Sequence, residues 1–463
     1  MKSIVLGVIA LAVGAALAAP VPAAAADLAD IYHRALRNDP QLREAEANRL
    51  AALEQKPQAL GVLLPQVTGT AGYVHDELSQ TFPYVDQNSN VVSLNALTKG
   101  DTTQWAVQLR QTIFRWSQFS QLRAADLSVA QAEADYRAAQ ESVILRTATA
   151  YFDVLAARDT LDAAEASREA ISRQLEQSQK RFEVGLIAVT DVEEAKAAND
   201  QAIATVIASK RTLATTREKL RELTGDSFDE LARPGDDMPL VAPTPASEDQ
   251  WVRSALDQNL ELSSARLAAD IARENVSMAR GAHLPTLDLV ASRSGSNASA
   301  NESFAGGPRQ PADTTLNDKQ ISLQLTVPIY TGGTTSSRVR ESVYRHRAAH
   351  ERLERTARAT ERSTRDAYLG VISEISRVQA LKQSLESSRI ALSATEAGYE
   401  VGTRTAVDVL LARQRLFDAQ TAYARSRYDY VVNVLTLEEA AGTLDESRLT
   451  RVNAWLGQTV SVK

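Results

Sequence analysis

The chain has 463 residues, of which 24% are charged and none is cysteine, and its formal net charge at pH 7 is −7. Without cysteine it has no disulfide bonds, no thiolate metal site and no cysteine nucleophile. The net negative charge argues against nucleic acid as a partner.

Residues 1–26 have the pattern of a secretory signal peptide. Lys2 supplies a positive charge, Ile4 to Ala19 is apolar, and Ala24 to Ala26 forms an A-x-A cleavage site. We therefore expect an exported mature protein without a lipid anchor, because such an anchor requires cysteine at the cleavage point. No later run of 18 apolar residues predicts a transmembrane helix, although strands could still enter a membrane.

An internal repeat divides the rest of the chain. Glu183-Val184-Gly185 recurs 217 residues later as Glu400-Val401-Gly402, and an aspartate follows each glycine by six residues. Each copy has the order helix, strand, loop, strand, very long helix, hairpin tip, helix. The pattern predicts a first repeat over 27–225, a linker over 226–250, a second repeat over 251–442 and a C-terminal tail over 443–463.

The first repeat is predicted to contain a helix over 27–60, strands over about 66–75 and 103–114, a long helix over 115–181 and a helix over 188–223. The second begins with a helix after 251. It then has strands over about 286–293 and 319–330, a long helix over 336–397 and a helix over 406–441. The polar segments 76–101 and 293–319 are predicted to be surface loops. Each hairpin tip is expected to turn at a glycine in the left-handed conformation.

The strands alternate apolar and polar residues. Trp105, Val107 and Leu109 share one face, and Gln104 and Gln108 share the other. This alternation suits a membrane barrel with lipid outside and water inside, and it also fits a β-sandwich packed on its own core. Four strands cannot close a barrel, so the strands would pair with other copies, whether two, three or four in total.

The long helix over 115–181 has no proline or glycine and would measure about 100 Å. Leu122, Val129, Tyr136 and Val143 recur at sevens, which is the pattern of a coiled coil. Because the helix is too long to cover so small a sheet, we expect it to continue away from the sheet in a helical cylinder or bundle.

Four motifs carry a resemblance to a known family: ATAYF from Ala148, HLPTLDL from His283, PIYTGG from Pro328 and VGTRTAVDVL from Val401. In this order, and together with the repeat, they resemble the TolC family of outer-membrane channel-tunnels over nearly the whole mature chain. The resemblance implies a membrane α+β fold in which a homotrimer forms a 12-stranded outer-membrane β-barrel, with four strands per protomer. A long α-helical coiled-coil barrel would continue it through the periplasm, and linker and tail would form an equatorial belt.

The family implies a passive exit duct for drug efflux or type I protein secretion. An inner-membrane RND, ABC or MFS transporter and a periplasmic adaptor, a membrane fusion protein, would open its periplasmic end. Outer-membrane lipid is a further expected partner, and nucleic acid is not. The alternative is a non-conducting coiled-coil spacer or adhesin of the cell envelope, which would have the same helical periodicity.

The resemblance assigns the gate to the hairpin tips. Tyr399 and Arg404 belong to the second tip, and Thr190 and Asp191 of the first tip match the family's partners that hold the mouth closed. The guanidinium of Arg404 could donate two hydrogen bonds to a carboxylate such as Asp191. In the first copy of the repeat, the position that corresponds to Arg404 is Ile187, so the two tips are not equivalent. The same residues could also serve only to stabilise ordinary turns.

Asp408 is the candidate for the pore constriction. Repeated by threefold symmetry, it would place three carboxylates around the pore and favour cations. The family often has a second aspartate three residues later, where this chain has Leu411. We therefore expect one acidic ring with an apolar ring beside it.

No enzyme motif is present: GxxxxGK, HExxH and GxSxG are all absent. His346 and His350 have a metal-binding spacing but lie among Arg345, Arg347 and Arg352, which would repel a cation. We interpret them as part of a solvated helix face. The sequence predicts no catalytic residue, no cofactor and no metal site.

Overall fold

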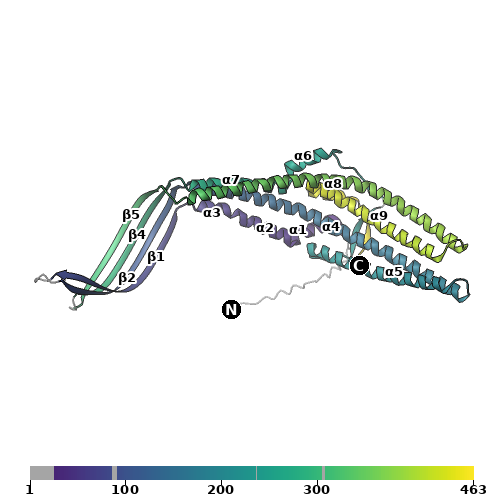
Figure 1. Ribbon diagram of the computed structural model, residues 1–463, viewed down its shortest axis with the longest axis horizontal. Coiled ribbons are helices and arrows are strands. Elements are labelled where there is room, and N and C mark those ends of the chain that lie inside the picture. The colour runs from purple at the N-terminus through teal and green to yellow at the C-terminus, as the bar shows by residue number, and fades with distance from the viewer. Residues whose placement is uncertain (1–25, 86–90, 236, 305–307, 463) are drawn as a thin grey trace, which may run out of the picture. The chain divides into compact units, whose positions relative to one another are not determined.

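The computed structural model describes residues 26–85, 91–235, 237–304 and 308–462. The predicted signal peptide, residues 1–26, lies outside these ranges except for Ala26. The chain divides into two compact units. We call Gln41–Ala139 with Val252–Ser363 the sheet unit, and Met1–Pro40 with Gln140–Trp251 and Thr364–Lys463 the hairpin unit. Figure 1 labels the elements of both.

The sheet unit contains one antiparallel sheet of four long strands in the order β1-β2-β4-β5. The strands are β1 (Gln66–Val85), β2 (Val91–Phe114), β4 (Thr286–Phe304) and β5 (Gln310–Thr326), and Figure 1 shows them curving together. Among the described residues, β1 and β5 each have one unpaired edge.

The predicted alternation is confirmed by the strand register. Val67 pairs with Leu109, Leu109 with Ala291, and Ala291 with Ile321. Residues directly opposite one another on neighbouring strands share a face, so these four apolar residues form a row across the whole sheet.

The predicted loops over 76–101 and 293–319 were wrong in their described parts, because the strands continue through them. β1 and β2 pair from Gln66 with Arg110 up to Val85 with Val91, and β4 and β5 pair in the same way. The ladder satisfies the backbone hydrogen bonds whatever the side chains are, so polar composition alone did not indicate a loop. The predicted strand over 319–330 ends at Thr326 instead, two residues before Pro328, which has no N–H for a ladder.

The predicted helix over 27–60 was also wrong, since it is three helices: α1 (Leu28–Asn38), α2 (Pro40–Leu53) and α3 (Gln55–Gly61). Asp39 is extended, with ψ 117°, because the ring of Pro40 disfavours the helical conformation in the preceding residue. The second repeat has a similar break between α6 (Glu248–Gln258) and α7 (Leu260–Gly281), so α6 begins inside the predicted linker. The Asn259 side chain caps α7 by accepting a hydrogen bond from the backbone N–H of Leu262.

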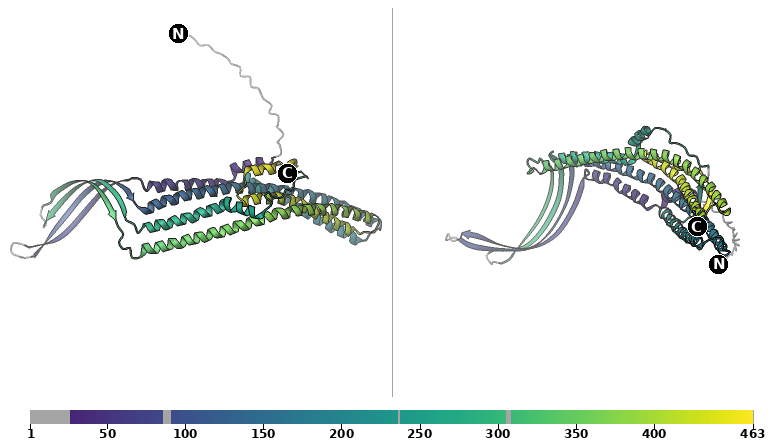
Figure 2. Two further views of the ribbon diagram at one scale, coloured as in Figure 1. Left: turned by 90° about the horizontal axis from the view of Figure 1, so that it is seen from above. Right: turned by 45° about the vertical axis from the view of Figure 1, so that its right-hand side comes forward.

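The long helices agree with their predictions to within a few residues. They are α4 (Trp116–Glu183), α5 (Val189–Thr224), α8 (Thr334–Glu400) and α9 (Ala406–Ala440), and Figure 2 shows α4–α5 and α8–α9 as helical hairpins. On α4 the heptad positions Val143, Ala150, Ala157, Ala164 and Ile171 are buried. In the part of the chain that the structure describes, none of the helices is both long and apolar enough to cross a membrane.

The predicted linker and tail pair with each other in the hairpin unit. β3 (Glu230–Pro234) and β6 (Leu456–Ser461) form an antiparallel ladder, and Ala26 forms a parallel bridge with Leu231. The tail also contains α10 (Glu446–Asn453), and its Leu449 is fully buried. Both segments are therefore folded parts of the hairpin unit.

Candidate functional site

The two hairpin tips reverse at the glycines predicted from the sequence. Gly185 has φ 76° and Gly402 has φ 78°, a conformation that glycine adopts without strain. At the first tip the N–H of Leu186 donates to the carbonyl of Arg181 over 2.8 Å. At the second, Thr403 donates to Gly398 over the same distance. These bonds satisfy carbonyls at the helix ends, and the predicted turn is confirmed.

The second tip has a capping box that the first tip lacks. The carboxylate of Asp408 accepts from the backbone N–H of Thr405 at 2.9 Å and from its hydroxyl at 3.0 Å, while the Thr405 hydroxyl accepts from the N–H of Asp408 at 3.2 Å. At the first tip the corresponding cap is Ala188, which has no such side chain. The helix α9 therefore starts at a defined residue.

The same bonds set the charge of Asp408. The backbone N–H of Thr405, then its hydroxyl, and then the positive charge of Arg404 lower the pKa of the Asp408 carboxyl below its ordinary value. The carboxylate consequently stays ionised through neutral and mildly acidic pH.

Tyr399 joins the two hairpins through its ring. The guanidinium of Arg181, in the last turn of α4, lies 4.7 Å from the ring centroid in a cation–π contact. The ring also packs against the buried cluster of Leu392, Val409 and Ala412. The hydroxyl of Tyr399 is buried and has no hydrogen-bond partner within the described chain. The ring is therefore held in place, while its polar atom is left without an acceptor.

An ion pair fixes the second hairpin close to its tip. A guanidinium nitrogen of Arg413 on α9 lies 2.5 Å from a carboxylate oxygen of Glu396 on α8. Glu396 precedes the turn at Gly402 and Arg413 follows it, and the antiparallel hairpin brings the two side chains together. The ion pair consequently joins α8 and α9 close to the tip.

The predicted gate residues occupy both tips, but no hydrogen bond or ion pair of the described chain joins them. Arg404 and Thr190 are exposed and Asp191 is half-buried. The sequence interpretation missed Arg181 and Thr405. The T-x-x-D pattern of Thr405 and Asp408 was visible in the sequence, whereas the contact of Arg181 with Tyr399 depends on tertiary packing.

Leu411 lies on the side of α9 that faces the other hairpin. It is 51% exposed and lines a cavity of about 210 Å³ between α4, α5 and α9. Val407, Leu410 and Phe417 lie on the same wall, and Ala198 and Gln201 belong to α5. Leu411 thus adds apolar surface to a groove between the two hairpins.

Comparison with known proteins assigns the chain to a family. The model of the outer membrane efflux protein family matches residues 31–226 and 251–443. The outer membrane protein TolC of Vibrio cholerae is 37% identical over 433 residues, covering 93% of this chain and 94% of the relative. The alkaline protease secretion protein AprF of Pseudomonas aeruginosa is 28% identical over 429 residues, covering 92% and 86%. Among solved structures, the Campylobacter jejuni CmeC outer membrane channel matches with a TM-score of 0.72 at 19% identity, covering 92% and 89%.

The chain belongs to the outer membrane efflux protein family, a family of transport proteins. It is a protein of the cell outer membrane, with its helical part in the periplasm. The predicted fold class is confirmed by the likeness to CmeC, and the β-sandwich alternative is wrong because the four long strands lie in one sheet.

Proposed function

We propose that three copies of this chain form a passive exit duct across the outer membrane, for drug efflux, type I protein secretion or both. Its relatives support this conclusion by what their names say: TolC is an outer membrane protein, AprF is an alkaline protease secretion protein, and CmeC is an outer membrane channel. The family description adds efflux.

The single observation that carries the proposal is the sheet with two free edges. A long exposed edge strand pairs with another chain unless something covers it. Here β1 and β5 present one such edge each within the described residues. Three copies of a four-stranded sheet, joined β5 to β1, close a barrel of twelve strands, above the practical minimum of about eight.

The apolar face of the sheet supplies the surface that such a barrel needs outside. On β5, Ile321 is 81% exposed, Leu323 62% and Leu325 63%, which is unusual for side chains of this kind in water. In a membrane barrel they contact lipid, and the intervening polar residues line the lumen.

The duct works with a periplasmic adaptor and an inner-membrane transporter of the RND, ABC or MFS class. The exterior of the hairpins α4–α5 and α8–α9 near their tips is the expected adaptor surface. Energy for export comes from the inner-membrane transporter, because the duct itself has no motif for nucleotide binding or catalysis.

In the closed duct, Arg404 and Tyr399 of one tip link to Thr190 and Asp191 of a tip in a neighbouring copy. Exposed ion pairs contribute about 0–1 kcal/mol each, so the three symmetric pairs of Arg404 with Asp191 contribute about 3 kcal/mol at most. A docking partner can outweigh that amount. The three copies of Asp408 form the charged constriction at the tips.

The proposal is tested in cells by deleting the gene and restoring it with variants. Deletion should increase sensitivity to exported drugs or remove proteins from the culture medium, and the wild-type gene should reverse the change. Arg404→Ala should restore export and also increase entry of antibiotics too large for general porins. The control is Arg389→Ala, since Arg389 has only a weak contact of 4.0 Å with Glu386 on the same helix. A deletion that changes neither drug sensitivity nor secretion would favour the non-conducting spacer or adhesin.

A further inference from the structure

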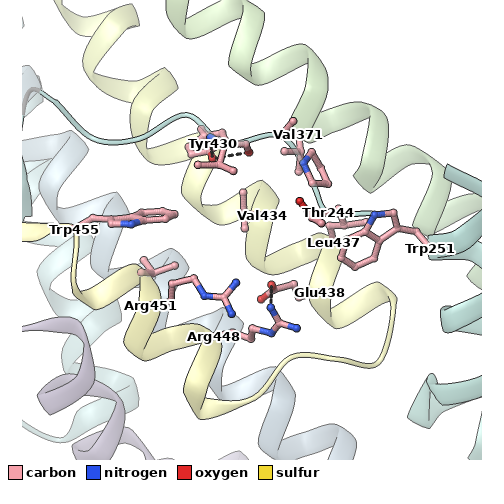
Figure 3. Close-up of a pocket in the computed structure, with 14 residues that line it drawn as sticks. Thr244, Trp251, Val371, Tyr430, Val434, Leu437, Glu438, Arg448, Arg451 and Trp455 are labelled. Atoms are coloured by element: carbon pink, nitrogen blue, oxygen red, sulfur yellow. Dashed lines mark hydrogen bonds and ion pairs between the residues drawn. The ribbon is translucent and has the colours of Figure 1, made fainter. Parts of the chain in front are cut away.

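A cavity of about 170 Å³ lies in the hairpin unit, away from the tips. Figure 3 shows the side chains around it. They come from five parts of the chain: the linker segment 241–244, Trp251 on α6, Val371 on α8, the α9 residues from Tyr430 to Glu438, and the segment from Arg448 to Trp455. The proposed duct function uses none of them.

The apolar walls of this cavity are held rigidly. The hydroxyl of Tyr430 accepts from the backbone N–H of Val241 at 2.8 Å and donates to its carbonyl at 3.0 Å. The indole of Trp251 donates to the carbonyl of Pro245 at 2.8 Å, and the ring of Trp455 stacks on Tyr430 with centroids 6.5 Å apart. The walls are thus formed before any ligand binds, which reduces the entropy lost on binding.

The polar end of the cavity has more positive than negative groups. Arg448 lies 3.4 Å from the buried carboxylate of Glu438, as the dashed line in Figure 3 marks. Arg451 lines the same end, is exposed and makes no ion pair within 4.0 Å with any residue that the structure describes. Its positive charge and that of Arg448 oppose the rise that burial causes in the pKa of Glu438. Two guanidinium groups therefore face one carboxylate. One guanidinium is left to bind an anion.

We propose that this cavity binds a small aromatic carboxylate, with the carboxylate on the guanidinium of Arg451 and the ring between the walls of Trp251, Tyr430 and Trp455. The planar fork of arginine matches a carboxylate with two hydrogen bonds. A cavity of about 150 Å³ holds benzene, so about 170 Å³ suits one aromatic ring with a short acidic group and excludes two fused rings with substituents.

The bound anion would touch the linker, α8, α9 and α10 together. A ligand that binds the folded state and not the unfolded state raises the apparent stability of that state. Occupancy of the cavity would therefore stabilise the hairpin unit against unfolding without contact to the tips.

The experiment measures binding of benzoate to the purified full-length protein in detergent by isothermal titration calorimetry, with protein-free micelles as the blank. Benzamide, which has the same shape and no charge, is the matched ligand. We expect benzoate to bind at least about tenfold more tightly than benzamide, because a charge-assisted hydrogen bond is stronger than a neutral one. Arg451→Gln should remove this difference and leave the weak binding of benzamide unchanged.

Two further variants keep the result interpretable. Arg211→Gln removes an exposed arginine of α5 that makes no ion pair among the described residues, and benzoate binding should not change. Val434→Phe fills the cavity and should abolish binding of both ligands, while circular dichroism reports that the helices are intact. Equal binding of benzoate to wild type, Arg451→Gln and Val434→Phe would overturn the site, as would benzoate that binds no better than benzamide.

Discussion

Replacing Tyr399 with phenylalanine isolates the role of one buried hydroxyl. The ring packs on Leu392, Val409 and Ala412 and lies over the guanidinium of Arg181, and phenylalanine keeps both contacts. The hydroxyl has no acceptor in the described part of its own chain. Its acceptor in a closed duct must therefore be a neighbouring copy or water.

The size of the effect follows from the number of copies. A hydrogen bond contributes about 1 kcal/mol, so three symmetric bonds favour the closed state by about 3 kcal/mol. Their removal shifts the equilibrium between closed and open states about a hundredfold toward the open state. Single-channel recording of Tyr399→Phe should show this as increased open probability.

The matched control for this prediction is Tyr423→Phe. The ring of Tyr423 lies 5.7 Å from the guanidinium of Arg427, and its hydroxyl has no hydrogen bond among the described residues. Both variants thus remove a hydroxyl from a ring that lies beside an arginine, one near the tip and one not. An open probability for Tyr399→Phe no higher than that for Tyr423→Phe would refute the reasoning.

Three further predictions concern charged groups. Asp408→Asn should reduce the cation preference measured from reversal potentials, and an unchanged reversal potential in this variant would place the selectivity filter elsewhere. Thr405→Val should raise the pH at which the cation preference is lost, because Thr405 lowers the pKa of Asp408. Burial, then the charges of Glu439 and Asp445, raises the pKa of Glu141 from 4.5 to about 7. The folded state therefore binds a proton that the unfolded state releases, so the unfolding temperature should fall as pH rises from 4.5 to about 7. This fall should be smaller in Glu141→Gln. If the unfolding temperatures of wild type and Glu141→Gln depend on pH in the same way, Glu141 is not the cause of the pH dependence. Asp288→Ala should destabilise the sheet unit by about 2–3 kcal/mol in denaturant unfolding, because the buried Asp288 carboxylate accepts from Arg110, Thr112 and Arg115. Asp313→Ala, on the exposed part of β5, is the control for Asp288→Ala. Equal losses of unfolding free energy in the two variants would contradict a stabilising role for the hydrogen bonds of the buried Asp288.

Much of the fold could be predicted because strong local signals agree with the tertiary structure. The long proline-free stretches became α4 and α8, and the glycines at 185 and 402 became left-handed turns. The prediction failed where a weaker signal was overlooked, as at Asp39 before Pro40, where the predicted helix is interrupted. It failed again in the polar strands, because hydrogen bonding between β1 and β2 overrides side-chain composition.

The site could be predicted only in part. The motif places Tyr399, Arg404 and Asp408 on one tip, and the capping box of Thr405 follows from residue spacing. The cation–π contact of Arg181 with Tyr399 joins residues more than two hundred positions apart, and no local pattern indicates it. The links from Arg404 to Asp191 remain a prediction about contacts between copies.

Single-channel recording of the purified protein in planar lipid bilayers distinguishes a duct from a non-conducting spacer. We expect the wild-type trimer to conduct weakly and with cation preference, and Arg404→Ala to conduct several times more. A purified trimer that never conducts, with or without Arg404, would contradict the assignment of this chain as a duct.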